Sequence, residues 1–202
     1  MGFEFGTFTD RFEKLEEALQ IIVPMLRGER PSLEGAHYQA TDVINSPAPL
    51  SRVPVMIGGS GEKKTLRMVA QYADESNLIC DPAEVHRKLD ALAAHCERLG
   101  RDRAEITVSL QRNVIIAETY DAAFDAARRF FGERGMDLDA LDADRLQGVL
   151  GMMVLGDPDH VGQQLSDALA TGIDGFTCNL VANGHEIEPV ELLGEVLTKV
   201  VS

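Results

Sequence analysis

Three glycines and a serine stand between an apolar segment and a segment of helical pattern. The apolar segment is 53–57, the helical pattern covers about 63–73, and the small residues between them are Gly58, Gly59, Ser60 and Gly61. At a strand-to-helix junction such a loop exposes main-chain N–H groups beside a helix N-terminus, where the helix dipole also favours negative charge. The sequence therefore predicts an anion site suited to a phosphate-bearing ligand. The alternative is a tight turn whose glycines only supply positive φ angles.

The side chains next to this loop allow two interpretations. Lys63, Lys64 and Arg67 follow it, and a cation near a bound phosphate is chemically sensible. For two of these three residues we expect a solvent-exposed helix face instead. Met56 and Ile57 end the apolar segment, where they contact either the ligand or, as we expect, the core.

The remaining residues with reactive side chains form no recognisable constellation. The histidines show no metal-ligand spacing, so we expect no metal site; they are His37, His86, His95, His160 and His185. His185 lies beyond the last expected strand and is interpreted as a loop residue, with a proton donor as the alternative. Cys80, Cys96 and Cys178 form no CxxC pair, and we expect reduced, buried thiols.

Composition excludes several classes of partner. The 202 residues carry a formal net charge of −14, which argues against broad binding to nucleic acid or to an anionic membrane surface. A small anionic ligand remains compatible, because a few main-chain amides can bind a phosphate locally. No run of about 18 apolar residues exists, and the N-terminus has no basic segment leading into an apolar one. We therefore expect a cytoplasmic protein that does not bind membranes.

Helices and strands alternate along the chain. We expect one domain over 1–202, with a lead helix at 10–28 that Asp10 and Glu13 open as a capping box. Strand–helix units follow at 53–73, 76–100, 106–135 and 173–201, with a helical excursion at 136–171 and an irregular segment at 29–52. Asp81 and Asp157, each followed by proline, predict helix starts. Strict alternation predicts parallel strands. Four strands cannot close a (β/α)8 barrel of about 250 residues, so the fold is either part of a barrel or a small open α/β sheet.

Six segments, in order along the chain, resemble the luciferase-like monooxygenase superfamily. They are 11–20, 54–67, 70–77, 96–102, 156–158 and 172–176. The closest resemblance is to the branch that uses the deazaflavin coenzyme F420. It implies a partial (β/α)8 TIM barrel, corresponding to the C-terminal half, and an F420-dependent oxidoreductase that transfers hydride to or from a small organic substrate.

The resemblance also implies roles for the site residues. Gly58 to Gly61 would hold the phosphate-bearing tail of the cofactor. Asn77 ends a segment that in the family commonly reads Ala-Asp-Gly-Trp-Asn; Glu75 and Ser76 replace the Gly-Trp here. We expect Asn77 to face the ligand. An FMN-dependent monooxygenase remains an alternative, because the loop does not separate the two cofactors.

The resemblance begins at the fourth helix of the family's barrel. Strands one to four, which in the family hold most catalytic residues, have no counterpart, so no residue is assigned a catalytic role and independent catalysis is not expected. We expect either a truncated reading frame or a half-barrel that pairs with a second copy, since exposed sheet edges favour association. A non-catalytic half-barrel that acts only by self-association is the third alternative. The substrate is not indicated.

Overall fold

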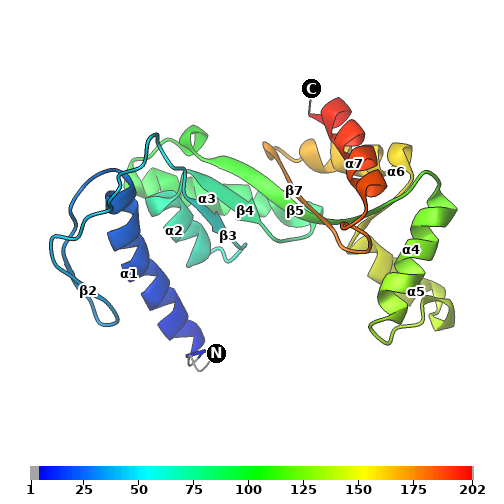
Figure 1. Cartoon of the computed structure of the whole chain (residues 1–202), viewed down its shortest axis with the longest axis horizontal. Coiled ribbons are helices and arrows are strands. Elements are labelled where there is room, and N and C mark those ends of the chain that lie inside the picture. Colours follow the sequence, from blue (N-terminus) through cyan, green and yellow to red (C-terminus); the bar gives the residue numbers. More distant parts are fainter. Residues whose placement is uncertain (1–4, 202) are drawn as a thin grey trace. The chain divides into compact units, whose positions relative to one another are not determined.

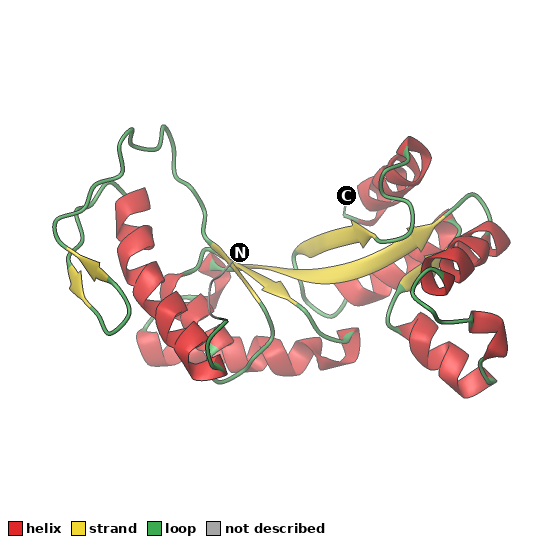
Figure 2. Ribbon diagram, turned by 60° about the horizontal axis from the view of Figure 1, so that its bottom comes forward, coloured by secondary structure: helices red, strands yellow, loops and turns green. Residues whose placement is uncertain are grey.

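A computed structural model describes residues 5–201 of the chain (Figure 1). It contains two compact units, which are described separately. The first comprises Met1–Ser76 and Asp90–Ile106, and the second comprises Asn77–Leu89 and Thr107–Ser202. Each unit contains both helices and strands (Figure 2). The expectation of one domain over 1–202 concerns how these units join, and it stays a prediction.

The lead helix, α1 (Phe8–Leu26), begins two residues before the predicted start. Its cap is Thr7, not the predicted Asp10 and Glu13: the Thr7 hydroxyl accepts from the Asp10 N–H at 3.2 Å, and the Asp10 carboxylate accepts from the Thr7 N–H at 2.9 Å. This reciprocal pair satisfies two donors at the helix start. Leu19 and Val23 form the buried stripe of α1.

Segment 29–52 is not wholly irregular, which corrects the prediction. It contains an antiparallel pair, β1 (Leu33–Glu34) and β2 (Gln39–Ala40). The carboxylate of Glu17 in α1 accepts hydrogen bonds from three successive N–H groups in the connecting turn, at 2.8, 2.9 and 2.8 Å; the donors are Ala36, His37 and Tyr38. The contact spans about twenty residues of sequence, so no local pattern reveals it.

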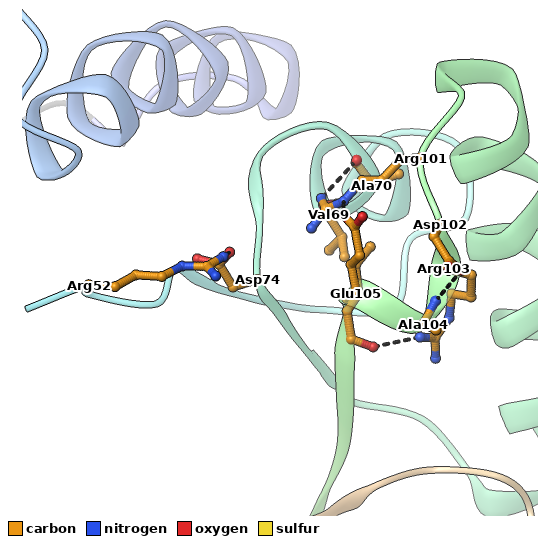
Figure 3. A network of polar contacts seen from close by, with 10 residues as sticks. Arg52, Val69, Ala70, Asp74, Arg101, Asp102, Arg103, Ala104 and Glu105 are labelled. Atoms are coloured by element: carbon orange, nitrogen blue, oxygen red, sulfur yellow. Dashed lines mark hydrogen bonds and ion pairs between the residues drawn. The ribbon is translucent and has the colours of Figure 1, made fainter.

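The first unit continues with β3 (Met56–Gly58) and α2 (Thr65–Tyr72); β4 (Glu75–Leu78) follows at the boundary between the units. The strand begins three residues after the predicted 53. The reason lies at Val55, whose N–H donates to the Asp74 carboxylate at 2.9 Å and whose carbonyl accepts from Asp74 and Glu75. Arg52 pairs with the same carboxylate, as Figure 3 shows.

Arginine side chains fix α2 at both ends. Arg101 donates to the main-chain oxygens of Val69 and Ala70, at 3.4 and 3.0 Å, in the last turn of α2 (Figure 3). The terminal carbonyls of a helix have no partner within it, so this contact serves as a C-terminal cap. At the first turn, Arg67 donates to both carboxylate oxygens of Glu16 in α1, at 2.8 and 2.7 Å. These contacts hold the helix that follows the glycine loop.

Asp81 and Asp157 cap the elements that follow them, as predicted. Asp81 accepts from the Ala83 N–H at 2.8 Å and opens a short 3-10 turn, η1 (Pro82–Glu84), ahead of α3 (Val85–Leu99). Asp157 accepts from the His160 N–H at 3.0 Å and opens α6 (Pro158–Leu169). A second 3-10 turn, η2 (Arg103–Glu105), precedes the long strand β5.

The sheet of the second unit is parallel, as predicted. Its central strand β5 (Thr107–Ile116) pairs with β7 (Gly175–Leu180), with Ser109 opposite Gly175, and with β6 (Val154–Gly156), with Val114 opposite Val154. The strand β6 corrects the predicted helical excursion at 136–171, which instead contains η3 (Leu138–Ala140), α5 (Ala143–Gly151), β6 and α6. The sequence did not reveal β6 because its three residues, all buried, are too few to show a hydrophobic period. Its pairing with β5 is a long-range contact, which local sequence patterns do not show. A fifth strand–helix unit results.

Helices cover both faces of the C-terminal half of β5 (Figure 1). On one face, helix α4 (Tyr120–Gly132) and η3 pack against Ile115 with Ala127, Phe131 and Leu138. On the other, α6 and α7 (Ile187–Val200) pack against strand residues; the buried members of this cluster are Val114, Ile116, Val154, Val161, Leu165, Leu193 and Val196. Each fully buried aliphatic side chain contributes roughly 1.5–3 kcal/mol to this core.

Candidate functional site

The glycine loop lies between the end of β3 and the start of α2, as predicted. Gly59 has a φ angle of +123°, a conformation that residues with a Cβ rarely adopt. A Cβ atom on Gly61 would lie 2.9 Å from the hydroxyl oxygen of Thr65, and one on Gly59 would lie 3.3 Å from its methyl carbon. Thr65 is buried beneath the loop. Packing around Thr65 and a positive φ angle therefore account for two of the glycines.

Two carbonyl groups of the loop point toward donors within the first unit. The Gly61 oxygen accepts from the Leu66 N–H at 3.0 Å. The Glu62 oxygen lies 2.7 Å from Nε2 of His95 on α3. Arg98 donates to Nδ1 of the same imidazole at 2.7 Å, which places the histidine proton on Nε2. Both carbonyl oxygens thus accept hydrogen bonds from the protein. They therefore do not face, and do not repel, an anion that would approach the loop.

The three cations after the loop have different surroundings. Arg67 is committed to Glu16, and their hydrogen bonds raise the pKa of the guanidinium and lower that of the carboxyl group. The Nζ atom of Lys64 lies 5.8 Å and 5.2 Å from the ring centres of Phe8 and Phe12. Lys63 and Lys64 are exposed, as expected for two of the three, but they lie in the turn before α2 and not on a helix face, whereas Arg67 is half-buried.

Met56 and Ile57, at the end of the apolar segment, differ in burial. Ile57 is buried against the core, as expected, whereas the Met56 side chain is 49% exposed.

A hollow of about 570 Å³ lies at the opposite end of β3 from the glycine loop; its lining includes Arg27, Pro49 and Asp74. Burial raises the pKa of Asp74, but the Val55 N–H and Arg52 outweigh it, so the net pKa is lowered. The Asp74 carboxylate therefore serves contacts within the first unit, with Val55 and Arg52.

Asn77 belongs to the second unit and is described there. Its Oδ1 accepts from the Ser109 hydroxyl at 3.3 Å. Ser109, Gln111 and Asn113 alternate along β5 and therefore share one face of the strand. Gln111 donates to the Asn113 Oδ1 at 3.3 Å, and Asn179 of β7 donates to the same oxygen at 3.4 Å.

This row of polar side chains was not predicted from the sequence. The signal was present as a period-two pattern of serine, glutamine and asparagine within a segment that reads as a strand. Its carboxamides offer both donors and acceptors, and all but Asn179 are half-buried. Such a row can provide a hydrogen-bonding surface for a polar ligand.

The remaining candidates from the sequence are His185 and the three cysteines. His185 is exposed after β7, and its side chain lies beside Glu186 at 3.8 Å. Cys96 is buried, as expected, whereas Cys80 and Cys178 are only half-buried, and none of the three forms a disulfide within residues 5–201. Within residues 5–201 no group of three or more His, Cys, Asp or Glu side chains is arranged to hold a metal ion. In the same residues no helix is both long and apolar enough to cross a membrane.

Comparison with known proteins decides the family. Residues 2–175 match the family described as luciferase-like monooxygenase. The chain belongs to this family. The predicted resemblance is thereby confirmed.

Two curated members of the luciferase-like monooxygenase family illustrate the relationship. An F420-dependent glucose-6-phosphate dehydrogenase of Microbacterium testaceum is 30% identical over 132 residues, which cover 63% of this chain and 39% of the relative. The F420-dependent glucose-6-phosphate dehydrogenase 1 of Rhodococcus jostii is 24% identical over 204 residues, covering 91% and 58%. The chain therefore spans well under two thirds of the length of these relatives.

Solved structures of the luciferase-like family have the same fold. The F420-dependent tetrahydromethanopterin reductase of Methanopyrus kandleri superposes with a TM-score of 0.72 at 16% identity, covering 95% of this chain and 64% of the reductase. An F420-dependent secondary alcohol dehydrogenase, in complex with an F420–acetone adduct, gives 0.73 at 15% identity, covering 98% and 64%. These relatives are TIM barrels, which confirms the predicted fold class of a partial barrel with parallel strands.

Proposed function

We propose that this chain is the C-terminal, cofactor-binding part of an F420-dependent oxidoreductase. In this proposal the main-chain N–H groups of Gly58, Gly59, Ser60 and Gly61 hold the phosphate of the cofactor, and Asn77 faces the ligand. When bound, F420 would donate a hydride to the substrate or accept one from it. The substrate is a small organic molecule, and its identity is open.

The observation that carries the proposal is the glycine loop itself. No Cβ fits on Gly61 without displacing Thr65, so at this position no side chain covers the main chain. His95 and the Leu66 N–H engage the carbonyls next to it. Main-chain N–H groups beside a helix N-terminus suit a phosphate. The printed names of the curated relatives then favour F420 over other phosphate-bearing cofactors.

The chain's own contribution is to bind and orient. The loop would fix the phosphate, because its position is set by β3, by α2 and by the contact with His95. The carboxamides of Asn77, Asn113 and Asn179 can hydrogen-bond polar groups of a ligand without changing charge. No acid or base in the described residues is assigned to proton transfer.

Fluorescence titration of the full chain with F420 tests the proposal. We expect saturable binding, and a loss of affinity of at least tenfold in Gly61→Val, because the added side chain must displace Thr65 or the loop. Gly148→Ala is a matched control, since a Cβ there meets no atom within 4 Å. If FMN binds and F420 does not displace it, the FMN-dependent alternative replaces this proposal; a riboflavin lyase with modified FMN has the same fold at a TM-score of 0.71.

We further propose that the chain acts in the cytoplasm as a homodimer. Cysteines that form no disulfide among the described residues are typical of a reducing compartment, and a partial barrel leaves strand edges that a second copy can cover. Analytical ultracentrifugation should give a dimer mass at micromolar concentration. A monomer at the same concentration would contradict the dimer, while leaving F420 binding to be judged by the titration above.

A further inference from the structure

Arg112 lies in the middle of β5, opposite Cys178 of β7. Its side chain is half-buried, and its Nε atom is buried with no hydrogen-bond partner in the part of the chain that the structure describes. Burial lowers the pKa of the guanidinium, and the attraction of Asp81 and of two thiols only partly offsets this. A buried donor without an acceptor is costly to keep.

The surroundings of Arg112 within the second unit do not neutralise its charge. Asp81 is the carboxylate that acts on it, yet Asp81 accepts from the Ala83 N–H and forms no ion pair with Arg112 among the described residues. The other nearby groups are the thiols of Cys80 and Cys178. Burial raises the pKa of Cys178, although Arg112 opposes this, so the thiol stays uncharged near neutral pH.

Arg112 also lines a cavity of about 240 Å³ beside β5. The segment after β4 contributes Cys80 and Asp81, the segment before β6 contributes Met152, and β5 contributes Gln111 and Asn113. A water molecule occupies about 30 Å³ in the liquid, so the space admits a phosphate or carboxylate group with part of the molecule that carries it.

We propose that Arg112 binds an oxyanion in this cavity, namely a carboxylate or phosphate group of a small molecule. The planar guanidinium presents Nε–H and Nη–H as a fork, which matches two oxygens of such a group. Within residues 5–201 nothing accepts from the Nε side of this fork, and the anion would supply the acceptor. This inference rests on the second unit alone and does not depend on the proposed binding of F420.

Titration of the full chain with inorganic phosphate and, separately, with acetate tests the site. By isothermal calorimetry in a buffer free of both ions, we expect saturable binding of at least one. Arg112→Met should weaken it at least tenfold, and Arg112→Lys should weaken it less, because a single charge replaces the fork. Arg145→Met is the matched control, since Arg145 is an exposed arginine of α5. Preference for phosphate or for acetate identifies the group. No binding of either ion, or equal binding by Arg112→Met, overturns the proposal.

Thermal unfolding without ligand separates this role from a structural one. If Arg112 is kept for a ligand, Arg112→Met removes a half-buried charge that has no ion pair among the described residues, and the melting temperature should rise or stay constant. A structural role predicts a clear fall. Should Arg112→Met not fold, the wild-type protein still decides: phosphate or acetate must shift the NMR resonance of the Arg112 Nε–H, and an unshifted resonance contradicts the proposal.

Discussion

The Nε2 atom of His95 lies 2.7 Å from the main-chain oxygen of Glu62, immediately after the glycine loop. The two residues come from different elements of the first unit, α3 and the turn before α2. Arg98 fixes the imidazole from the other side, at Nδ1. The loop conformation therefore depends on a side chain more than thirty residues away, and not on its glycines alone.

Removal of this contact should weaken anion binding at the loop. His95→Ala loses one hydrogen bond to the carbonyl, a net effect of about 0.5–1.5 kcal/mol, or roughly two- to twelvefold in the dissociation constant for F420. His95→Gln can donate from its side-chain amide and should bind more tightly than His95→Ala. Equal affinities of both variants and the wild type would show that Glu62 does not orient the loop.

Arg67 provides the contrasting case. Since both of its terminal nitrogens donate to Glu16, Arg67→Met should leave the affinity for F420 within twofold of the wild type. Its cost should appear in stability: a double-mutant cycle with Glu16→Gln should give a coupling energy of about 1 kcal/mol in urea unfolding, modest because both side chains are partly exposed. A large loss of F420 affinity with no coupling would make Arg67 a ligand residue.

The turn between β1 and β2 should respond to acid through Glu17. Burial raises the pKa of this carboxyl group, but hydrogen bonds from His37, Tyr38 and Ala36 outweigh it, so its net pKa is below the ordinary value of 4.5. Because the folded-state pKa is lowered, the ionised group stabilises the fold above about pH 4.5, and this contribution is lost as the pH falls through the folded-state pKa.

Glu17→Gln should therefore be less stable than the wild type at pH 7, and the difference should shrink at pH 3. Urea unfolding at both pH values measures it. Glu34→Gln is a suitable control, because Glu34 lies on the same hairpin and is exposed. A difference that is the same at pH 7 and pH 3 would mean that the Glu17 charge does not hold the turn.

The short strand β6 should behave as a core element. Leu155 is 6% exposed and belongs to the cluster that contains Ile115 and Phe131. Leu155→Ala should lower the free energy of unfolding by about 2–5 kcal/mol. The neighbouring Met152 is 65% exposed, so Met152→Ala should change it by less than about 0.5 kcal/mol. Similar effects of both variants would argue against a buried β6.

Local signals in the sequence were sufficient for much of this fold. The aspartate–proline pairs at Asp81 and Asp157 marked the starts of η1 and α6, and the glycine run marked the turn before α2. Each of these features depends on residues within a few positions of one another. The alternation of strands and helices likewise predicted a parallel sheet, and β5 confirms it.

The features that escaped prediction depend on long-range contacts. The turn between β1 and β2 is held by Glu17, and β6 is defined by pairing with β5. At the site, Gly61 looked like a residue selected for a ligand, whereas the structure adds Thr65 as a packing reason for it. His95 and Arg112 had no distinguishing neighbours in sequence, because their partners are contributed by other elements.

The most direct test of the proposed function is F420 binding by the full chain and by Gly61→Val, with Gly148→Ala as the control and circular dichroism to verify folding. We predict saturable quenching of F420 fluorescence for the wild type and the control, and an affinity at least tenfold lower for Gly61→Val. A folded wild-type protein that does not bind F420, or a Gly61→Val variant that binds it as tightly as the wild type, would contradict a phosphate site at residues 58–61.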